Sequence, residues 1–383
     1  MSKINFYFQS FGFLVGMIVG AGMFALPYAF LKAGLFWGLA HLAIALFFIL
    51  VLHIFYGEIA FLTGGKHRFP GYVNKFLGQG YARISFLITI FSYYGTLLVY
   101  GVLGGIFLHN VFPLMSVFFL SVLFFGLGAF LLLFRFEKIG LVNFYLTLPL
   151  LVFILYLLGV SAPHIRLENF LAETGGKLWF LPYGVWIFSL SGFAVIPEVR
   201  DIFNHRTDEG GLKDFKRIIW ISILISLFFY LVFIFAVLGS GGALTSEDAL
   251  SGLKGTIGEV AIIIGSLIGF LAVFTSYLAL GADFKNIFMI DYNRSFVLSW
   301  GLVVLAPIAL YFLGFQNFVR TISLIGALGL GVQGTFIVLM SLKLHKFFPE
   351  HKHLISPKRK ILNYILIFGL ILGVALELRQ LFN

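Results

Sequence analysis

The 383-residue chain contains no cysteine and little charge. The absence of cysteine excludes disulfides, thiolate metal sites and cysteine nucleophiles. Charged residues make up 11% of the chain, whereas soluble domains carry about 25%. In their place, 60% of the residues are hydrophobic and 49 are phenylalanine. This composition predicts an all-α integral membrane protein, and we assign the net charge of +10 to loops rather than to a nucleic-acid-binding surface.

Apolar segments of about 20 residues, the length that a helix needs to cross the hydrocarbon core, recur along the chain. The first of them has no small-residue cleavage site after it, so we expect it to stay in the protein as a transmembrane helix. The eleven predicted spans are Phe8–Leu31, Phe36–Leu62, Ile84–Leu108, Met115–Leu133, Ile139–Val160, Trp179–Ile202, Ile218–Leu238, Ile257–Ala282, Ser295–Leu313, Phe318–Leu342 and Ile361–Leu381.

Lysine and arginine are unevenly distributed between the two sides of these spans. Most of the 26 basic residues fall on the side of the amino terminus, and the largest group lies between the tenth and eleventh spans. Because cytoplasmic loops are enriched in basic residues, this asymmetry predicts a cytoplasmic amino terminus and an external carboxyl terminus.

The first span contains the stretch "GMIVGAGMFALPYAF", Gly16 to Phe30, with three glycines and one proline. An interior glycine destabilises a helix by roughly 0.5–1 kcal/mol relative to alanine, and an interior proline by about 3 kcal/mol. Lipid cannot replace the backbone hydrogen bonds that such residues loosen. Two explanations are open: Gly16 and Gly20 form a GxxxG motif for close helix packing, or the helix opens here to form a site.

A second interruption lies in the sixth span, where "VWIFSLSGFAVIPEV" places residues 189–192 in mid-span and Pro197 shortly beyond. Five spans precede this one, so helices 1–5 and 6–10 would insert with opposite orientation. Paired interruptions in two inverted halves point to the binding site of a transporter, with helices 1 and 6 discontinuous. The predicted divisions are residues 1–160 and 161–342 for the two inverted repeats, and 343–383 for a cytoplasmic loop and helix 11.

An open helix exposes backbone groups that can bind a ligand. Free N–H groups at the start of a half-helix suit a carboxylate, and carbonyl groups at the end of one suit an ammonium group or a metal cation. A zwitterionic amino acid matches both, and nearby aromatic residues favour an apolar or aromatic side chain. The predicted substrate-binding residues are Gly20, Ala21, Gly22, Tyr94, Phe188, Ser189, Leu190, Ser191 and Phe193.

The stretch "GAGMFALPYAF" resembles the first-helix motif of the amino acid/auxin permease family, in particular its tryptophan/tyrosine permease branch. The "VIPE" that ends at Glu198 is also similar to that family. The family belongs to the amino acid–polyamine–organocation superfamily, which has the LeuT-type fold of 5+5 inverted repeats. The resemblance implies uptake of neutral amino acids by alternating access, in the inner membrane of a prokaryotic cell, with an eleventh helix outside the repeat.

The eighth span contains "LAVFTSYLALGADF", in which Ala272, Thr275 and Ser276 form an A-x-x-T-S pattern similar to that of sodium symporters with this fold. The resemblance implies a coupling sodium ion held by this pattern and by the carbonyls of Gly16 and Val19, a set of five oxygens that suits a hard cation. Two alternatives are open. Such hydroxyls often bond to the carbonyl one turn earlier, and some permeases of this fold are proton-coupled, although the lysine that they often place in helix 5 is absent here.

Glu58 is the acidic residue deepest in the second span, and an intramembrane carboxylate is a functional candidate by default. Resemblance to LeuT-like transporters implies a structural or gating contact with the opened part of helix 6. Proton carriage and a place at the cytoplasmic interface near Lys66 are the alternatives. Glu198 and Asp283, toward the cytoplasmic ends of helices 6 and 8, are expected to be solvated gate or loop partners.

Other classes of function find little support in the sequence. It contains no G-x-S-x-G, H-E-x-x-H or phosphate-binding loop, and no cluster of intramembrane acids or nucleophiles that an enzyme would need. A channel would need repeated polar or charged rings. We therefore expect a transporter whose partners are an amino acid, a sodium ion and membrane lipids, with no cofactor and no nucleic acid.

Overall fold

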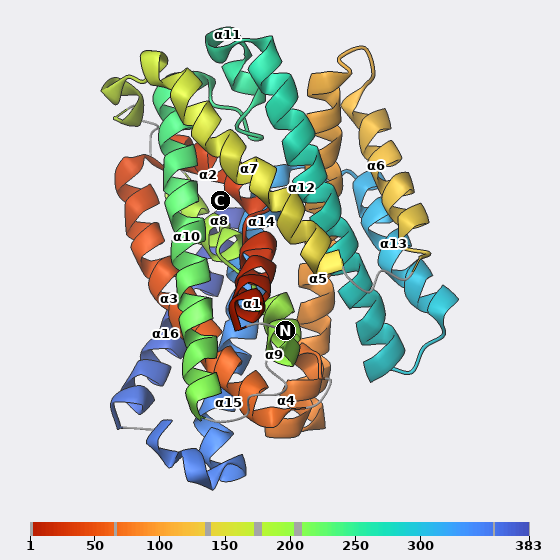
Figure 1. The fold of residues 1–383 in the computed structure, drawn as a ribbon, viewed down its shortest axis with the longest axis vertical. Helices are drawn as coiled ribbons and strands as arrows, with labels where there is room; N and C mark the ends of the chain where they lie inside the picture. Colours follow the sequence, from red (N-terminus) through yellow and green to blue (C-terminus); the bar gives the residue numbers. More distant parts are fainter. Residues whose placement is uncertain are drawn as a thin grey trace.

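The structure, a computed structural model, describes residues 3–64, 67–134, 139–171, 178–202, 209–354 and 357–382, and these are helical almost throughout. Helices follow from the composition, because apolar segments in lipid must pair their backbone N–H and C=O groups internally. Most of the long helices run close to the long axis of the molecule (Figure 1). The long helices are α3 (Leu35–Thr63), α5 (Gln79–Val111), α7 (Ile139–Ser161), α10 (Glu209–Gly241), α12 (Glu259–Asn286) and α16 (Pro357–Phe382).

Within the described residues, seven helical segments are long and apolar enough to cross a membrane, or up to eight if a bent pair at the amino terminus is one span. That pair is α1 (Lys3–Ile18) and α2 (Gly22–Ala33). Two further helices are apolar but shorter, α6 (Val117–Leu131) and α13 (Phe296–Phe312). The sixth predicted span is divided between α8 (Leu181–Ser189) and α9 (Ile196–Ile202). The count of eleven spans and the inverted repeat stay predictions.

The helices form two groups. One contains α1, α2, α3, α8, α9 and α10, and the other contains α5, α6, α12 and α13. Helix α7 contacts α1 and α10 of the first group and α12 of the second. Both divided helices, α1–α2 and α8–α9, therefore belong to the same group.

Shorter elements lie between the long helices. At one end of the molecule, α4 (Phe69–Leu77) follows α3, and at the other end α11 (Lys254–Ile257) precedes α12 (Figure 1). Helix α4 was not predicted, and Pro70 in its first turn supports a helix start, where a missing N–H costs nothing. The tenth predicted span is α14 (Phe318–Leu324), a π-helical turn (Ile325–Leu330) and α15 (Gly331–Phe347). Short 3₁₀- or π-helical segments are Ala162–His164, Leu167–Phe170, Phe193–Val195, Gly242–Leu244, Ser251–Leu253, Ile287–Asp291 and Pro349–Leu354.

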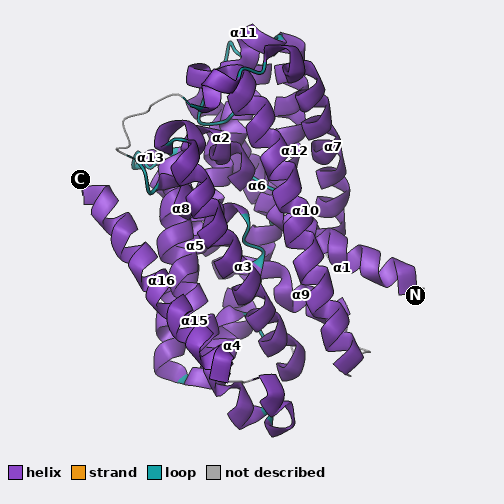
Figure 2. Cartoon of the chain, turned by 90° about the vertical axis from the view of Figure 1, so that its left-hand side faces the viewer, coloured by secondary structure: helices purple, strands orange, loops and turns teal. Residues whose placement is uncertain are grey.

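Helix α16 packs along α15 on one side of the molecule (Figure 2). Its carboxyl-terminal half carries Glu377, which is 4% exposed and accepts a hydrogen bond from Ser323 Oγ of α14 at 2.7 Å. The Gln380 side chain accepts the backbone N–H of Phe180 at 3.1 Å, just before α8. Polar contacts therefore fix the last helix against the start of α8.

Candidate functional site

The first interruption separates α1 from α2 as predicted. Helix α1 ends at Ile18, α2 begins at Gly22, and the two axes differ by 46°. Within the described residues, the backbone N–H groups of Ala21 and Gly22 donate no hydrogen bond. They lie at the start of α2, where the helix dipole is positive. This end of α2 therefore offers two amide donors to an anionic group.

The second predicted interruption is also present: α8 ends at Ser189, and a 3₁₀ turn, Phe193–Val195, precedes α9. His53 of α3 stabilises the open backbone, because its Nε2 accepts the N–H of Gly192 at 2.8 Å. Its Nδ1 lies 2.8 Å from the carbonyl oxygen of Ile49. An imidazole that accepts at Nε2 and donates at Nδ1 is neutral.

The two interruptions are in direct contact. A Cβ atom on Gly22 would lie 2.6 Å from Ser189 Oγ and 2.7 Å from Ser189 Cα, so glycine alone permits this approach. Tyr230 Oη of α10 lies 2.6 Å from the carbonyl oxygen of Ile18 and 2.9 Å from that of Ser189. These two residues end α1 and α8. One hydroxyl therefore shares its proton between the carbonyl ends of both divided helices.

Both interruptions border one cavity of about 820 Å³, a volume that includes its open mouth. All the predicted substrate-binding residues except Tyr94 and Leu190 line it. Helices α5 and α12 of the second group form the opposite wall. Polar residues outside the predicted substrate-binding set also line the cavity, among them Tyr56, Arg68, Tyr93, Tyr100, Asp283 and Gln333.

Two of the predicted substrate-binding residues, Tyr94 and Leu190, do not line this cavity. Tyr94 Oη donates to the carbonyl of Leu302 on α13 at 3.0 Å, away from the cavity. Its neighbour Tyr93, about 100° further around α5, and Tyr100 line the cavity instead. Leu190 lies at the second interruption but is 0% exposed. Period and span position alone do not fix the rotation of a helix that is apolar on all sides.

The residues predicted to bind sodium come from two segments, the chain around the end of α1 and helix α12. Gly16 lies in the last turn of α1, Val19 directly follows that helix, and the other three belong to α12. A Cβ atom on Gly20 would lie 3.6 Å from Ser276 Oγ, so α12 adjoins the opened backbone here. Within the described residues, the Val19 carbonyl accepts no hydrogen bond. All five predicted ligands are buried: Gly16, Val19, Ala272, Thr275 and Ser276.

The two hydroxyls of α12 bond back to their own helix. Ser276 Oγ donates to the Ala272 carbonyl at 2.9 Å. Thr275 Oγ1 lies 3.1 Å from the same carbonyl and 3.0 Å from that of Leu271. This is the arrangement that the sequence left open as the alternative. Donation of the proton does not by itself prevent a hydroxyl oxygen from binding a cation, because a hydroxyl is also an acceptor.

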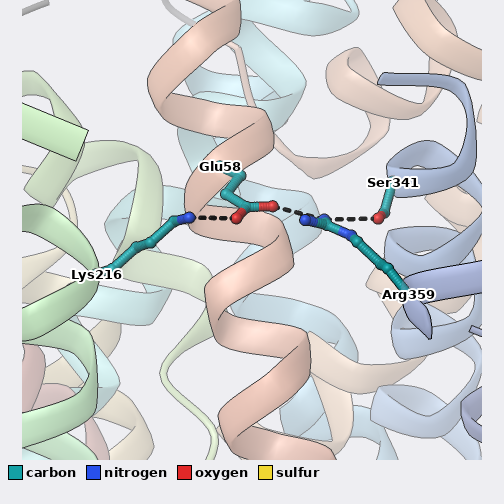
Figure 3. Close-up of polar contacts among 4 residues, drawn as sticks. All are labelled: Glu58, Lys216, Ser341 and Arg359. Atoms are coloured by element: carbon teal, nitrogen blue, oxygen red, sulfur yellow. Dashed lines mark hydrogen bonds and ion pairs between the residues drawn. The ribbon is translucent and has the colours of Figure 1, made fainter. Parts of the chain in front are cut away.

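Glu58 is 2% exposed, and its carboxylate is paired with two cations (Figure 3). Lys216 Nζ of α10 contacts Oε1, and Arg359 Nη2 of α16 lies 2.5 Å from Oε2. Arg359 also donates to Ser341 Oγ of α15 at 2.9 Å. His53 of α3 is the residue that bonds to the opened backbone of the second interruption. The ion pairs of Glu58 instead join α3 to α10 and α16. Lys66, the neighbour considered in the alternative, lies outside the described residues.

Arg68, just before α4, joins the two helix groups at one side of the cavity. Its Nη2 lies 3.1 Å from Glu198 Oε1 of α9, and its Nε lies 2.7 Å from Asp283 Oδ1 of α12. Tyr93 Oη donates to Asp283 Oδ2 at 2.8 Å. Burial opposes the charge of Arg68, but the carboxylates of Asp283 and Glu198 outweigh it and raise the pKa of the guanidinium. The two acids are therefore ion-paired and largely buried, contrary to the expectation of solvated side chains.

Sequence reasoning missed Tyr230, His53 and Arg68 for different reasons. Tyr230 lies in the run "SLFFYLVF", where it is one aromatic among many. His53 lies in an apolar span, where a polar ring needs a partner wherever the fold supplies one. Arg68 is one of many basic residues between the predicted spans, and the sequence distinguishes it only as part of their uneven distribution. The polar atoms of these residues were the available signal, and each residue has at least one partner more than one hundred residues away.

The structure is similar to those of known membrane transporters at low sequence identity. It matches MhsT in complex with L-phenylalanine with a TM-score of 0.66 and 15% identity, over 99% of this chain and 98% of that one. It matches Mhp1 in an inward-facing conformation with a TM-score of 0.67 and 13% identity, over 98% and 90%. A manganese transporter from Eremococcus coleocola matches with a TM-score of 0.59 and 14% identity, over 98% and 94%. These similarities establish the LeuT-type fold.

No curated protein sequence matches the chain. A family model does match, over residues 3–376, which is nearly all of the chain. This match agrees with the motif of the first interruption and with the long apolar helices of a membrane protein. The family and the similar structures are those of transporters, not enzymes. The chain therefore belongs to the tryptophan/tyrosine permease family.

Proposed function

We propose that the chain imports neutral amino acids with apolar or aromatic side chains by alternating access, coupled to sodium. The observation that carries the proposal is the pair of amides of Ala21 and Gly22 that donate no hydrogen bond and border the cavity. Two N–H donors at the positive end of a helix suit the carboxylate of an amino acid. Family membership and the fold support transport of such a substrate.

The substrate side chain would occupy the apolar part of the same cavity. Phe188 and Phe193 lie there beside the second interruption, and Leu280 contributes from α12. Aromatic and aliphatic walls favour substrates that bury apolar surface or stack. The similarity to MhsT, whose structure contains L-phenylalanine, is in line with this preference.

Alternating access would move the group that contains both divided helices against the group of α5, α6, α12 and α13. The interruptions supply the hinges, and Tyr230 would keep α1 and α8 moving together. The ion pairs of Arg68 with Glu198 and Asp283 join the two groups, so they would have to break when the cavity opens at that side. The excess of basic residues places this side, together with the amino terminus, in the cytoplasm.

Sodium is the coupling ion that we favour. The Val19 carbonyl accepts no hydrogen bond within the described residues, and Thr275 and Ser276 lie on α12 next to the first interruption. Bound sodium would stabilise the opened end of α1, whose dipole is negative there. Proton coupling is the alternative, because the α12 hydroxyls are already satisfied by their own helix.

The test is uptake of labelled neutral amino acids into proteoliposomes, with sodium and proton gradients imposed separately. We expect uptake driven by sodium, and loss of the sodium dependence when Thr275 and Ser276 are both changed to alanine. The matched control is Ser299→Ala, since Ser299 bonds back to Ser295 in the same way on α13. If uptake does not depend on sodium but follows the proton gradient, protons and not sodium are the coupling ion. No uptake of any neutral amino acid under either gradient would refute the proposed transport.

A further inference from the structure

Gln333 is a buried amide side chain on the wall of the cavity. It is 4% exposed, lines the cavity that both interruptions border, and forms no hydrogen bond within the described residues. A buried primary amide carries two donors and one acceptor, and leaving them unpaired is unfavourable. Gln333 is also the one amide side chain in the tenth predicted span. Such a group in a binding cavity is suited to a polar group of the ligand.

The backbone before Gln333 places it in the cavity. The π-helical turn Ile325–Leu330 contains one residue more than an α-helical turn, which rotates the following helix by about 100° relative to α14. A Cβ atom on Gly326 would lie 1.9 Å from the Gly184 carbonyl oxygen of α8. A Cβ atom on Gly329 would lie 2.2 Å from Ser92 Oγ of α5. The wide turn is therefore pressed between the helix of the second interruption and the opposite wall.

Other polar side chains on the α5 wall are already satisfied as donors. The hydroxyls of Thr89, Ser92 and Thr96 donate to the carbonyls one turn earlier, at 2.7–2.9 Å. Ser189 Oγ donates to Val185 in α8 at 2.7 Å. Gln333 has no such partner within the described residues, so its amide is better suited than these hydroxyls to form a hydrogen bond with the ligand.

Resting on the proposed function, we infer that Gln333 is a specificity-determining residue that accepts the polar hydrogen of an aromatic substrate side chain, the indole N–H or the phenol O–H. An indole N–H is a donor only, so the amide oxygen of Gln333 is its complement. Apolar residues on the same wall, Ile325 and Leu330, contact the rest of the ring. A site built around a buried acceptor disfavours analogues that lack the donor, because binding them leaves the acceptor unpaired. Gln333 therefore discriminates side chains that carry such a donor from phenylalanine, which carries none.

The test measures how well unlabelled compounds inhibit uptake of labelled tryptophan in proteoliposomes. The probe is 1-methyltryptophan, in which a methyl group replaces the indole hydrogen. We expect it to inhibit about tenfold more weakly than tryptophan, the loss that one buried hydrogen bond produces. In Gln333→Leu the two compounds should differ by less than about threefold, and phenylalanine should inhibit more strongly relative to tryptophan than in the wild type, because no acceptor is left unpaired. Gln333→Glu, which keeps the acceptor, should retain the discrimination.

The controls separate hydrogen bonding from size. Leucine is close to glutamine in volume, so a purely steric rejection of the methyl group would persist in Gln333→Leu and overturn the inference. Gln316→Leu makes the same substitution outside the cavity, where the Gln316 amide donates to Tyr311, and should behave as the wild type. If Gln333→Leu does not fold, the wild type decides: equal inhibition by tryptophan and 1-methyltryptophan overturns the inference. Uptake of other neutral amino acids but no aromatic one overturns it while leaving transport intact.

Discussion

Replacing Gly22 by alanine tests the contact between the two interruptions. The new Cβ atom would lie 2.6 Å from Ser189 Oγ, 2.7 Å from Ser189 Cα and 3.0 Å from Phe188 Cδ1. The Cα belongs to the backbone and cannot rotate away, so α2 and α8 must separate by several tenths of an ångström. Overpacking of this kind costs about 1–3 kcal/mol. The gain in helix propensity from glycine to alanine, roughly 0.5–1 kcal/mol, is smaller.

Gly20→Ala provides the matched control, two residues earlier in the same motif. Its Cβ atom would meet Ser276 Oγ at 3.6 Å and the Met17 carbonyl at 3.9 Å, both ordinary van der Waals contacts. A general role of glycine in flexibility would make both substitutions harmful. A role in close approach makes only the substitution at Gly22 harmful.

The assay combines apparent melting temperature of the purified protein with initial uptake into proteoliposomes. For Gly22→Ala we expect a lower melting temperature and a loss of uptake of about 5-fold to 100-fold, which corresponds to the 1–3 kcal/mol. Gly20→Ala should stay within about threefold of the wild type. Wild-type behaviour of Gly22→Ala, or equal damage in both variants, would refute the reasoning.

Three further substitutions test other contacts. Tyr230→Phe removes the hydroxyl shared by the ends of α1 and α8 but keeps the ring, so it should destabilise the protein by about 1–3 kcal/mol. The measurement is the melting temperature, which should fall; an unchanged melting temperature would exclude a role for the hydroxyl. Glu58→Gln removes a buried anion from between two partly buried cations and should cost about 3–5 kcal/mol, seen as loss of folded protein in size-exclusion profiles. A normal profile would contradict this. Arg68→Gln breaks the ion pairs between the helix groups and should speed labelling of a single cysteine introduced at Ala194 in the cavity wall, with Arg68→Lys as the milder control. Because the chain has no native cysteine, the label reports that position alone, and equal labelling rates would exclude a closing role for Arg68.

The sequence by itself determined the membrane class and the positions of both interruptions. These are local properties: hydropathy over about 20 residues sets whether a segment enters lipid, and glycine or proline sets where a helix can open. Helix α1 ends at Ile18 and α8 at Ser189, beside the glycines and serines that predicted the openings. The motif at the first interruption also identified the family that the family match confirms.

Only the tertiary structure decided which side chains face the cavity and which groups are paired. Tyr93 and Tyr100 line the cavity and Tyr94 does not, because a helix that is apolar on every side gives no periodic signal for its rotation. The partners of Glu58 are on helices 158 and 301 residues away in the chain, and Gln333 reaches the cavity through a π-helical turn that composition does not reveal. Pairing across such separations depends on how helices pack, which no local pattern in the sequence specifies.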